Sequence, residues 1–328
     1  MNWNMLGHEW AVHLLREHIV RQQVRHAYLF TGPQGVGRRT LALRFAQALN
    51  CPQPPAPGEA CGACRVCQQI ERMQHPDLAV VQAEQRGGVL KVEQVRELQR
   101  SLALAPYESK YRLALLLHFE EANQNTANAL LKTLEEPAAN VILILTAESA
   151  EILLPTVVSR CEALRLRPIP TEQLSLGLQE RWQIPADEAP LLAAISDGRP
   201  GYALYLHQHP EYKEKRSAWL KEHSRLLRAN RIERFRFAEP LAKDKETTRA
   251  LLHVWLSVWR DVLLQASGAA LAPANLDYQA EIVELAQITG LQGAYRMVAG
   301  LENTIQMLDQ YINTRLALEV LMLDLPRV

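Results

Sequence analysis

A glycine-rich loop between a strand-like run and a helical pattern is the feature that most limits how this chain can fold. Residues 27–31 read Ala-Tyr-Leu-Phe-Thr, and the Gly32-Pro33 pair that follows ends the run, which indicates a buried strand. Residues 38–49 then carry apolar side chains at helical spacing. The loop at 32–40 therefore joins a strand directly to a helix, as expected in an α/β domain.

The same alternation continues as far as Pro168-Ile169-Pro170. Further apolar runs of strand length lie at 78–81, 113–117, 141–145 and, more weakly, 162–166. Helical patterns lie between them at 93–104 and 124–136. Strands buried on both faces and separated by helices indicate a parallel sheet. After residue 170 no strand is predicted, and residues 171–207 and 211–328 indicate a small and a larger helical unit.

Charge and composition narrow the class of protein. Among 328 residues, Lys+Arg and Asp+Glu both number 36, so the formal net charge is zero. Overall charge thus gives no reason to expect strong non-specific binding to nucleic acid, and contact with DNA requires a local patch or a partner chain. The N-terminus lacks a basic region followed by an apolar run, and no apolar stretch approaches the ~20 residues that span a bilayer. We expect a cytoplasmic protein with reduced thiols.

The loop at 32–40 is similar to a damaged phosphate-binding loop. The Walker A pattern G-x-x-x-x-G-K-[ST] joins a strand to a helix, and its glycines let backbone N–H groups approach phosphate oxygens. Gly32 and Gly37 fit this pattern, and Gly35 adds flexibility. The next two positions do not fit, because Arg38 replaces the Lys and Arg39 replaces the Mg²⁺-binding Ser/Thr. The alternative is an ordinary glycine-rich turn.

These two substitutions remove chemistry that hydrolysis needs. Arg38 is a longer, planar cation that would meet a phosphate from a different position than Lys. Arg39 cannot ligate Mg²⁺, because a guanidinium offers no lone pair. Thr40 comes one residue late and is turned about 100° away on a helix. We therefore expect nucleotide either not to bind or to bind without hydrolysis.

The acidic residues of a phosphate-loop enzyme are also missing from their expected place. A Walker B strand ends in carboxylates that hold Mg²⁺ and orient water. Counting back from the helix at 124–136 aligns Leu117 and His118 with those positions. Glu120 and Glu121 lie two or three residues further on, so a shift in register would restore a carboxylate.

Four of the five cysteines form a cluster with the spacing C-x9-C-x2-C-x2-C, namely Cys51, Cys61, Cys64 and Cys67. In a reducing compartment this clustering indicates a metal site rather than disulfides. Four thiolates suit a closed structural Zn²⁺ site and are also compatible with iron–sulfur ligation, and free thiols are the remaining alternative. We expect Cys161, far away in sequence, to pack in the core.

Several motifs resemble the AAA+ clamp-loader family of bacteria, in particular its delta-prime and gamma/tau subunits. The most specific are Asn-Ala-Leu-Leu-Lys-Thr-Leu-Glu-Glu-Pro at 128–137 and Ser159-Arg160-Cys161. Weaker similarities lie at 6–8, 26–30 and 313–319. The resemblance covers essentially the whole chain.

The resemblance implies a three-domain architecture. It consists of a RecA-like AAA+ domain at 1–168 with an inserted zinc module at 51–67, a helical lid at 169–208, and a helical collar for oligomerisation at 209–328. The family carries zinc at the inserted module, which favours Zn²⁺ over an iron–sulfur cluster. The implied partners are gamma/tau and delta subunits in a five-membered ring, with a sliding clamp and primed DNA reached through that ring and no membrane contact.

Within the family, damaged phosphate loops are typical of delta-prime, whereas the gamma/tau motor subunits have intact ones. In the segment that resembles sensor 2, Gly201 occupies the place of the usual arginine, with Arg199 close by. The resemblance therefore predicts a subunit without ATPase activity of its own, inside a DNA polymerase holoenzyme that is a nucleotidyltransferase complex.

Arg160 is implied to act on a neighbouring subunit. By resemblance, the arginine of Ser-Arg-Cys reaches the γ-phosphate of ATP bound by the adjacent subunit, as an arginine finger. From the residues alone, Arg160 is a surface arginine near a sheet edge. A chain whose own ATP site cannot hydrolyse nucleotide can still complete a partner's active site in this way.

Two other functions stay open from the sequence. One is a gamma-type ATPase motor with unusual ligands, and the other is a zinc-containing DNA-binding module with no loader role. The basic residues in 211–236 could touch phosphates, but a charge run is more often a solvated helix face, which is the interpretation we favour.

Overall fold

The computed structural model describes residues 3–85, 87–269, 271, 273–309 and 313–327. The chain divides into two compact units. The first comprises Met1–Gly177 and Gly198–Tyr202, and the second comprises Leu178–Asp197 and Ala203–Val328. Helices α7 (Thr171–Trp182) and α9 (Pro200–Gln208) each contribute to both units. The division into three domains at 168 and 208 stays a prediction.

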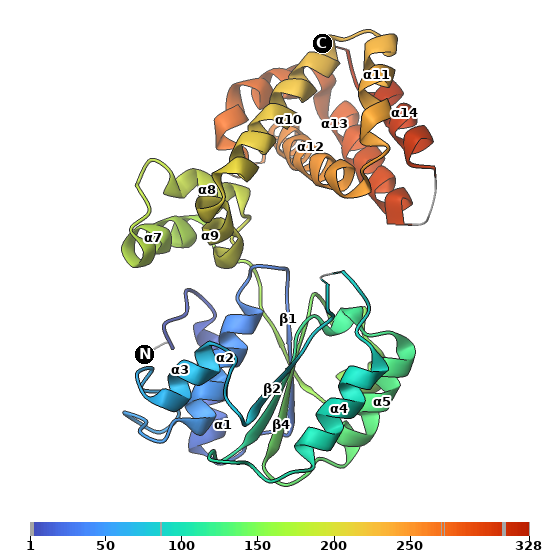
Figure 1. Cartoon of the computed structure of the whole chain (residues 1–328). Coiled ribbons are helices and arrows are strands. Elements are labelled where there is room, and N and C mark those ends of the chain that lie inside the picture. The colour runs from blue at the N-terminus through green and yellow to red at the C-terminus, as the bar shows by residue number, and fades with distance from the viewer. Residues whose placement is uncertain (1–2, 86, 270, 272, 310–312, 328) are drawn as a thin grey trace. The chain divides into compact units, whose positions relative to one another are not determined.

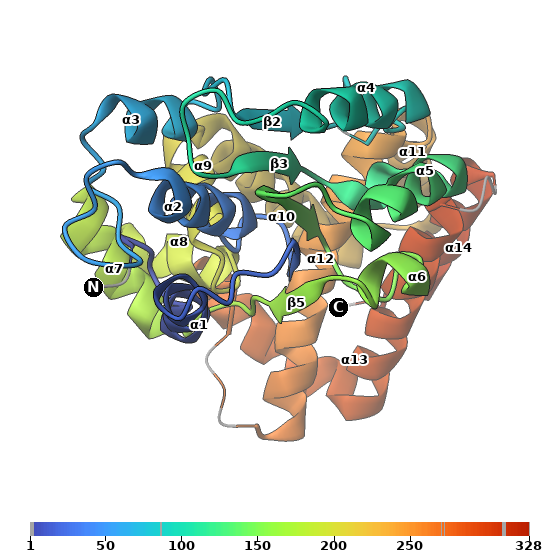
Figure 2. The same cartoon turned by 90° about the horizontal axis from the view of Figure 1, so that it is seen from below.

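The first unit contains a five-stranded parallel sheet, seen along its strands in Figure 2. Its strands are β1 (Ala27–Thr31), β2 (Leu78–Val81), β3 (Arg112–Leu116), β4 (Val141–Ala147) and β5 (Glu162–Arg165). Their order is β2-β3-β4-β1-β5, and every neighbouring pair is parallel. The predicted parallel sheet is confirmed, including the weak run that became β5. No strand follows β5 within the described residues.

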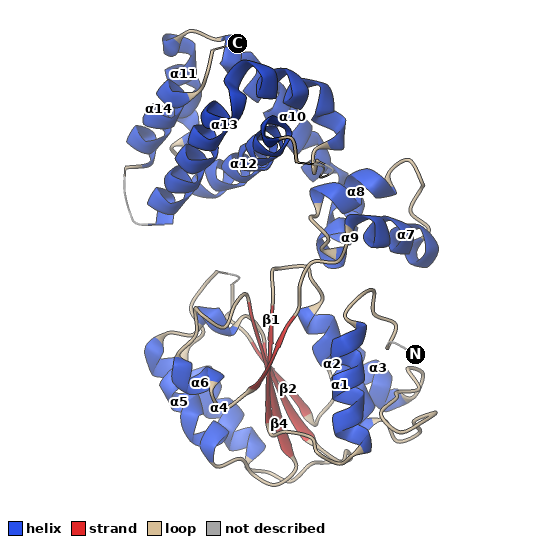
Figure 3. Ribbon diagram, turned by 180° about the vertical axis from the view of Figure 1, so that it is seen from behind, coloured by secondary structure: helices blue, strands red, loops and turns tan. Residues whose placement is uncertain are grey.

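Helices cover both faces of this sheet (Figures 1 and 3). One face packs against α1 (Glu9–Val20), α2 (Arg38–Asn50) and α3 (Arg65–Glu71), and the other against α4 (Val92–Leu102), α5 (Gln124–Glu135) and α6 (Pro155–Val158). Successive residues of a strand point to opposite faces, so Tyr28 and Phe30 of β1 join the first core while Leu29 joins the second. Both faces are buried, which explains the unbroken apolar runs.

Helix α5 begins as the sequence predicts. The Asn123 side chain accepts a hydrogen bond from the backbone N–H of Thr126, so it caps the helix. Leu130 and Leu134 are buried, and the helix ends at Glu135, shortly before Pro137.

Helical spacing predicts one shared face in α1 for Trp10, Leu14, Leu15 and Ile19. This is wrong for Trp10, which is 51% exposed. Leu15 is buried, and Leu14 and Ile19 are partly buried against the first core.

The second unit is helical, with a core that includes the fully buried Trp255 and Trp259. Besides α8 (Ala189–Ile195), its helices are α10 (Pro210–Arg228), α11 (Arg231–Leu241), α12 (Lys245–Ser267), α13 (Gln279–Asp309) and α14 (Thr314–Asp324), with the short η2 (Leu276–Tyr278) between α12 and α13. The Trp259 indole donates to Nε2 of the buried His223 at 3.0 Å. No helix in the described part of the chain is both long and apolar enough to cross a bilayer.

The basic segment at 211–236 is not a uniform solvated face. Arg216 is buried and binds Asp277 at 2.6 Å and Asn275 at 2.6 Å. Arg234 is buried and donates to backbone carbonyls at the end of α10 and the end of the chain, those of Leu226, Leu227, Met322, Leu325 and Pro326. The expectation of a solvated face is wrong for these two arginines, which hold the second unit together.

Candidate functional site

The glycine-rich loop follows β1 and leads into α2 with three glycines in the left-handed region of backbone conformation. The φ angles are 144° at Gly32, 82° at Gly35 and 115° at Gly37. Gly32 donates its backbone N–H to Glu148 O at 3.0 Å, and a Cβ there would lie 2.4 Å from Leu166 O. The three glycines of the predicted loop are thus required by its geometry.

Arg38 is the first residue of α2, and its side chain is buried, with 6% exposed. Its Nη1 lies 3.9 Å from Oε1 of Glu120, and Nδ1 of His118 lies 3.6 Å from the same oxygen. Burial alone would raise the pKa of Glu120, but hydrogen bonds from His118 and from the Glu120 backbone, together with the charge of Arg38, outweigh it and lower that pKa. Glu120 is therefore a carboxylate whose charge is balanced by groups of this chain.

The other positions aligned with the Walker motifs offer no group placed to bind Mg²⁺. Arg39 and Thr40 are both exposed at the start of α2. Leu117 is buried after β3, and His118 adopts a left-handed conformation with φ 52°. The carboxylate that faces Arg38 is Glu120, which lies on the 3-10 helix Phe119–Glu121 rather than at the end of β3.

The loop is held at its tip by the segment that resembles sensor 2. The backbone N–H of Gly201 donates to Gly35 O at 2.8 Å, and the Arg199 guanidinium lies 4.6 Å from the centre of the Tyr202 ring. A Cβ on Gly201 would lie 3.0 Å from Gly35 O, so a side chain larger than hydrogen crowds this contact. The position of the missing arginine is thus occupied by backbone packed against the loop.

His8 fixes the loop from the other side. Its Nε2 lies 3.0 Å from Val36 O, so the neutral ring donates to this carbonyl. Burial lowers the pKa of His8, and the bond to Val36 O opposes this only partly. His8 thus contacts the loop as a neutral donor.

We expect Gly35→Ala to destabilise the protein by about 2–3 kcal/mol, because a left-handed alanine costs about 1–2 kcal/mol and the new Cβ also meets backbone. That Cβ would lie 2.8 Å from the backbone nitrogen of Tyr202. The melting temperature should fall by about 6–10 °C in calorimetry. Gly87→Ala is the matched control, since Gly87 has φ 76° with nothing within 4 Å of its added Cβ. Equal melting of the two variants would contradict the proposed packing.

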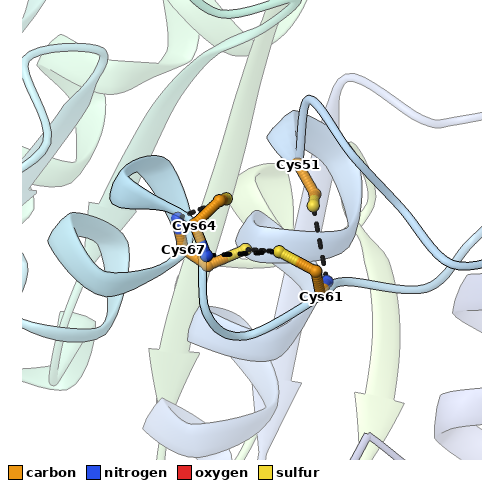
Figure 4. A group of neighbouring side chains, drawn as sticks. All are labelled: Cys51, Cys61, Cys64 and Cys67. Carbon is orange, nitrogen blue, oxygen red and sulfur yellow. Dashed lines mark hydrogen bonds between the residues drawn. The ribbon is translucent and has the colours of Figure 1, made fainter.

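The four predicted cysteines converge (Figure 4). Their sulfur atoms all lie within 4.8 Å of one another, and Sγ of Cys61 and Cys67 are 3.9 Å apart. Zn–S bonds of 2.3 Å in a tetrahedron place sulfurs about 3.8 Å apart, so the group fits one metal ion. Cys51 follows α2, Cys64 caps α3, and Cys67 lies within α3. Cys161 is partly buried against the second core and is not in the cluster.

Backbone N–H groups support the sulfur atoms. Cys61 N lies 3.4 Å from Cys51 Sγ, Cys64 N lies 3.3 Å from Cys61 Sγ, and Cys67 N lies 3.4 Å from Cys64 Sγ. Donation from the backbone at Cys64 and Ala63 lowers the pKa of Cys61 to about 6, whereas burial raises the pKa of Cys67. Such outer contacts stabilise thiolates and orient metal ligands.

The cysteine loop is anchored to the first unit. The Gln47 amide donates to Cys67 O at 2.8 Å, and Arg44 pairs with Glu71 of α3 at 2.7 Å. On the far side of the loop, the Trp3 indole donates to Gly58 O at 3.0 Å. The cluster therefore ties α2, α3 and the intervening loop together.

Arg160 lies between α6 and β5, with its side chain 35% exposed. Its Nη2 lies 2.7 Å from Oε1 of Glu135, and its Nη1 donates to Thr156 O at 2.8 Å. The arginine is thus held in place and still accessible. Its role toward a neighbour stays a prediction.

Sequence reasoning missed three residues of these sites. In the sequence Glu120 is only a neighbour of the aligned positions, whereas the structure brings it to Arg38. His8 and Glu135 lay inside recognised motifs without an assigned contact. For Glu135, its place beside the Pro137 end of α5 was the available signal, but its partner comes from another element.

The sheet order and the loop between β1 and α2 define a class of protein. A DNA polymerase III gamma subunit-related protein from Thermotoga maritima has a similar fold, with a TM-score of 0.50, 16% identity, and 95% of this chain and 97% of that chain covered. The chain is thus an α/β protein with a five-stranded parallel sheet, and its fold is similar to that of this solved structure.

Sequence comparison identifies the family within that class. The family model described as DNA polymerase III, delta subunit, matches residues 7–170. The DNA polymerase III subunit delta' of Pseudomonas aeruginosa is 36% identical over 242 residues, 73% of this chain and 71% of that protein. Its counterpart in Bacillus subtilis is 32% identical over 254 residues, 76% of this chain and 75% of that protein. The chain belongs to the DNA polymerase III delta-prime family of clamp-loader subunits.

Proposed function

We propose that this chain is a non-hydrolysing clamp-loader subunit that completes the ATP site of a neighbour. The observation that carries the proposal is the buried Arg38 directed at Glu120, with Nη1 and Oε1 3.9 Å apart. A hydrolysing site needs a carboxylate free to hold Mg²⁺ and a hydroxyl beside it. Here the Glu120 carboxylate faces a cation of its own chain, and Arg39 stands in the place of the hydroxyl.

The partners follow from the family. Gamma/tau and delta subunits would complete a five-membered ring, through which the chain supports loading of the sliding clamp on primed DNA in the cytoplasm. The collar at 209–328 would supply oligomer contacts. An exposed apolar stripe on α14 supports this, since Leu316, Val320 and Leu323 are 58%, 52% and 50% exposed. Contiguous exposed apolar patches are a feature of protein interfaces.

The cysteine cluster would hold a structural Zn²⁺. Four thiolates leave no open position for water or substrate, so the metal would stabilise the fold and take no part in chemistry. The contacts of Gln47 and Arg44 support this role, because they join the metal loop to the helix that follows the phosphate loop.

The isolated chain should release no phosphate from ATP above a no-enzyme blank, with or without Mg²⁺. The double variant Arg38→Lys and Arg39→Thr, which restores the Walker A residues, should also stay inactive, because Leu117 and His118 still follow β3 in place of two carboxylates. Phosphate release is measured with a gamma/tau-type subunit as the active control. Mg²⁺-dependent turnover by the wild type that Arg38→Ala removes would establish the motor function instead.

Copurification separates the proposal from a zinc-containing DNA-binding module. The full chain should form a stable complex with gamma/tau and delta subunits on size exclusion. A chain that binds DNA alone and forms no such complex would support the module.

A further inference from the structure

Arg160 is joined to a residue of a different sequence motif. Glu135 is the last residue of α5, and Arg160 lies in the turn after α6. The ion pair between Nη2 and Oε1 spans 2.7 Å, with side chains 35% and 50% exposed. Both residues belong to the first unit, so the pair does not depend on the arrangement of the two units.

The surroundings of Arg160 give its guanidinium a defined orientation. Nη1 donates to Thr156 O at 2.8 Å and lies 3.4 Å from Ser159 Oγ, while Nη2 contacts Glu135. A guanidinium carries five N–H donors, and three contacts leave two for another acceptor. Arg160 can therefore keep every contact it makes in this chain and still donate to a phosphate oxygen.

We propose that Glu135 is a positioning residue for Arg160. It holds the arginine in the orientation in which the two remaining N–H groups meet the γ-phosphate of ATP on the neighbouring subunit. This inference rests on the proposed function. Without the carboxylate, a long and partly exposed side chain regains rotamer freedom, and the reactive orientation becomes one of several.

The size of the effect follows from the kind of contact. An exposed ion pair contributes little to folding, so its loss should leave stability unchanged. If the ion pair stabilises the reactive orientation of Arg160 in the transition state by about 1 kcal/mol, its loss lowers the rate about fivefold. Loss of Arg160 itself removes charge stabilisation worth on the order of 10³-fold or more. Loss of Glu135 should therefore slow ATP hydrolysis far less than loss of Arg160, although both act on the phosphoryl-transfer step.

The test uses complexes of the full chain with delta and with gamma/tau-type ATPase subunits whose own finger arginines are replaced by alanine. Arg160 is then the only finger present. With this chain in saturating excess over the ATPase subunits, Glu135→Gln should lower kcat for ATP about fivefold and leave KM for ATP unchanged. Glu136→Gln is the matched control, since it removes the neighbouring carboxylate one residue later. Melting temperatures of both variants should equal the wild type.

A double variant separates positioning from a structural role. Glu135→Gln together with Arg160→Ala should be no slower than Arg160→Ala alone, because Glu135 acts only through the arginine. A further loss in the double variant, or equal rates for Glu135→Gln and wild type, would overturn the inference while leaving the proposed function standing. Full activity of Arg160→Ala would overturn both.

Discussion

Replacing Arg160 by alanine is expected to reduce ATP hydrolysis by the adjacent subunit by about 10³-fold, when no other finger arginine is present in the complex. A guanidinium stabilises the charge that develops on the transferred phosphoryl group, and this chain has no other group in the Ser-Arg-Cys position. Assembly and folding should be unchanged, because the Arg160 side chain is partly exposed and its ion pair with Glu135 is a surface contact.

Single-turnover hydrolysis in the assembled complex checks this prediction, with complex formation measured in parallel. Arg165→Ala is the control, because Arg165 is an exposed arginine nearby on β5. Arg160→Lys should recover only a small part of the rate, since an ammonium cannot present the planar fork. Wild-type rates for Arg160→Ala would mean that the neighbour's site is complete without this chain.

Replacing Cys67 by serine is expected to release the metal and to destabilise the first unit by about 4 kcal/mol when free zinc is about 1,000-fold above its dissociation constant. The Cys67 side chain is buried, so loss of its thiolate opens the cluster from inside. The melting temperature should fall by about 8–16 °C. Zinc content by mass spectrometry should fall from one equivalent per chain to a trace.

The control for the metal site is Cys161→Ser, which removes a thiol outside the cluster and should keep its zinc. Zinc uptake should release protons, because burial raises the pKa of Cys67 and the metal must displace its proton. Affinity should therefore weaken as pH falls. Full zinc content in Cys67→Ser would exclude this ligand set, and the visible absorption of an iron–sulfur cluster would exclude zinc.

Local patterns determined much of this protein from the sequence alone. The two-faced burial of the strands required unbroken apolar runs, and these runs predicted the parallel sheet of the first unit. Asn123 and Pro137 marked the ends of α5, because capping and the missing N–H of proline depend on adjacent residues. The cysteine spacing predicted the cluster itself, whereas the helix α3 that Cys64 caps became visible only in the structure.

Only the tertiary structure decided which distant residues meet. Arg38 faces Glu120, and Glu135 holds Arg160. The backbone of Gly201 packs on Gly35. In each case the partner lies on another element. The same holds for the buried Arg216 and Arg234 in a segment whose charge suggested a solvated face. A periodic pattern fixes which side of a helix or strand is apolar. The direction and partner of a polar side chain depend on the packing of elements far apart in sequence, which no local pattern encodes.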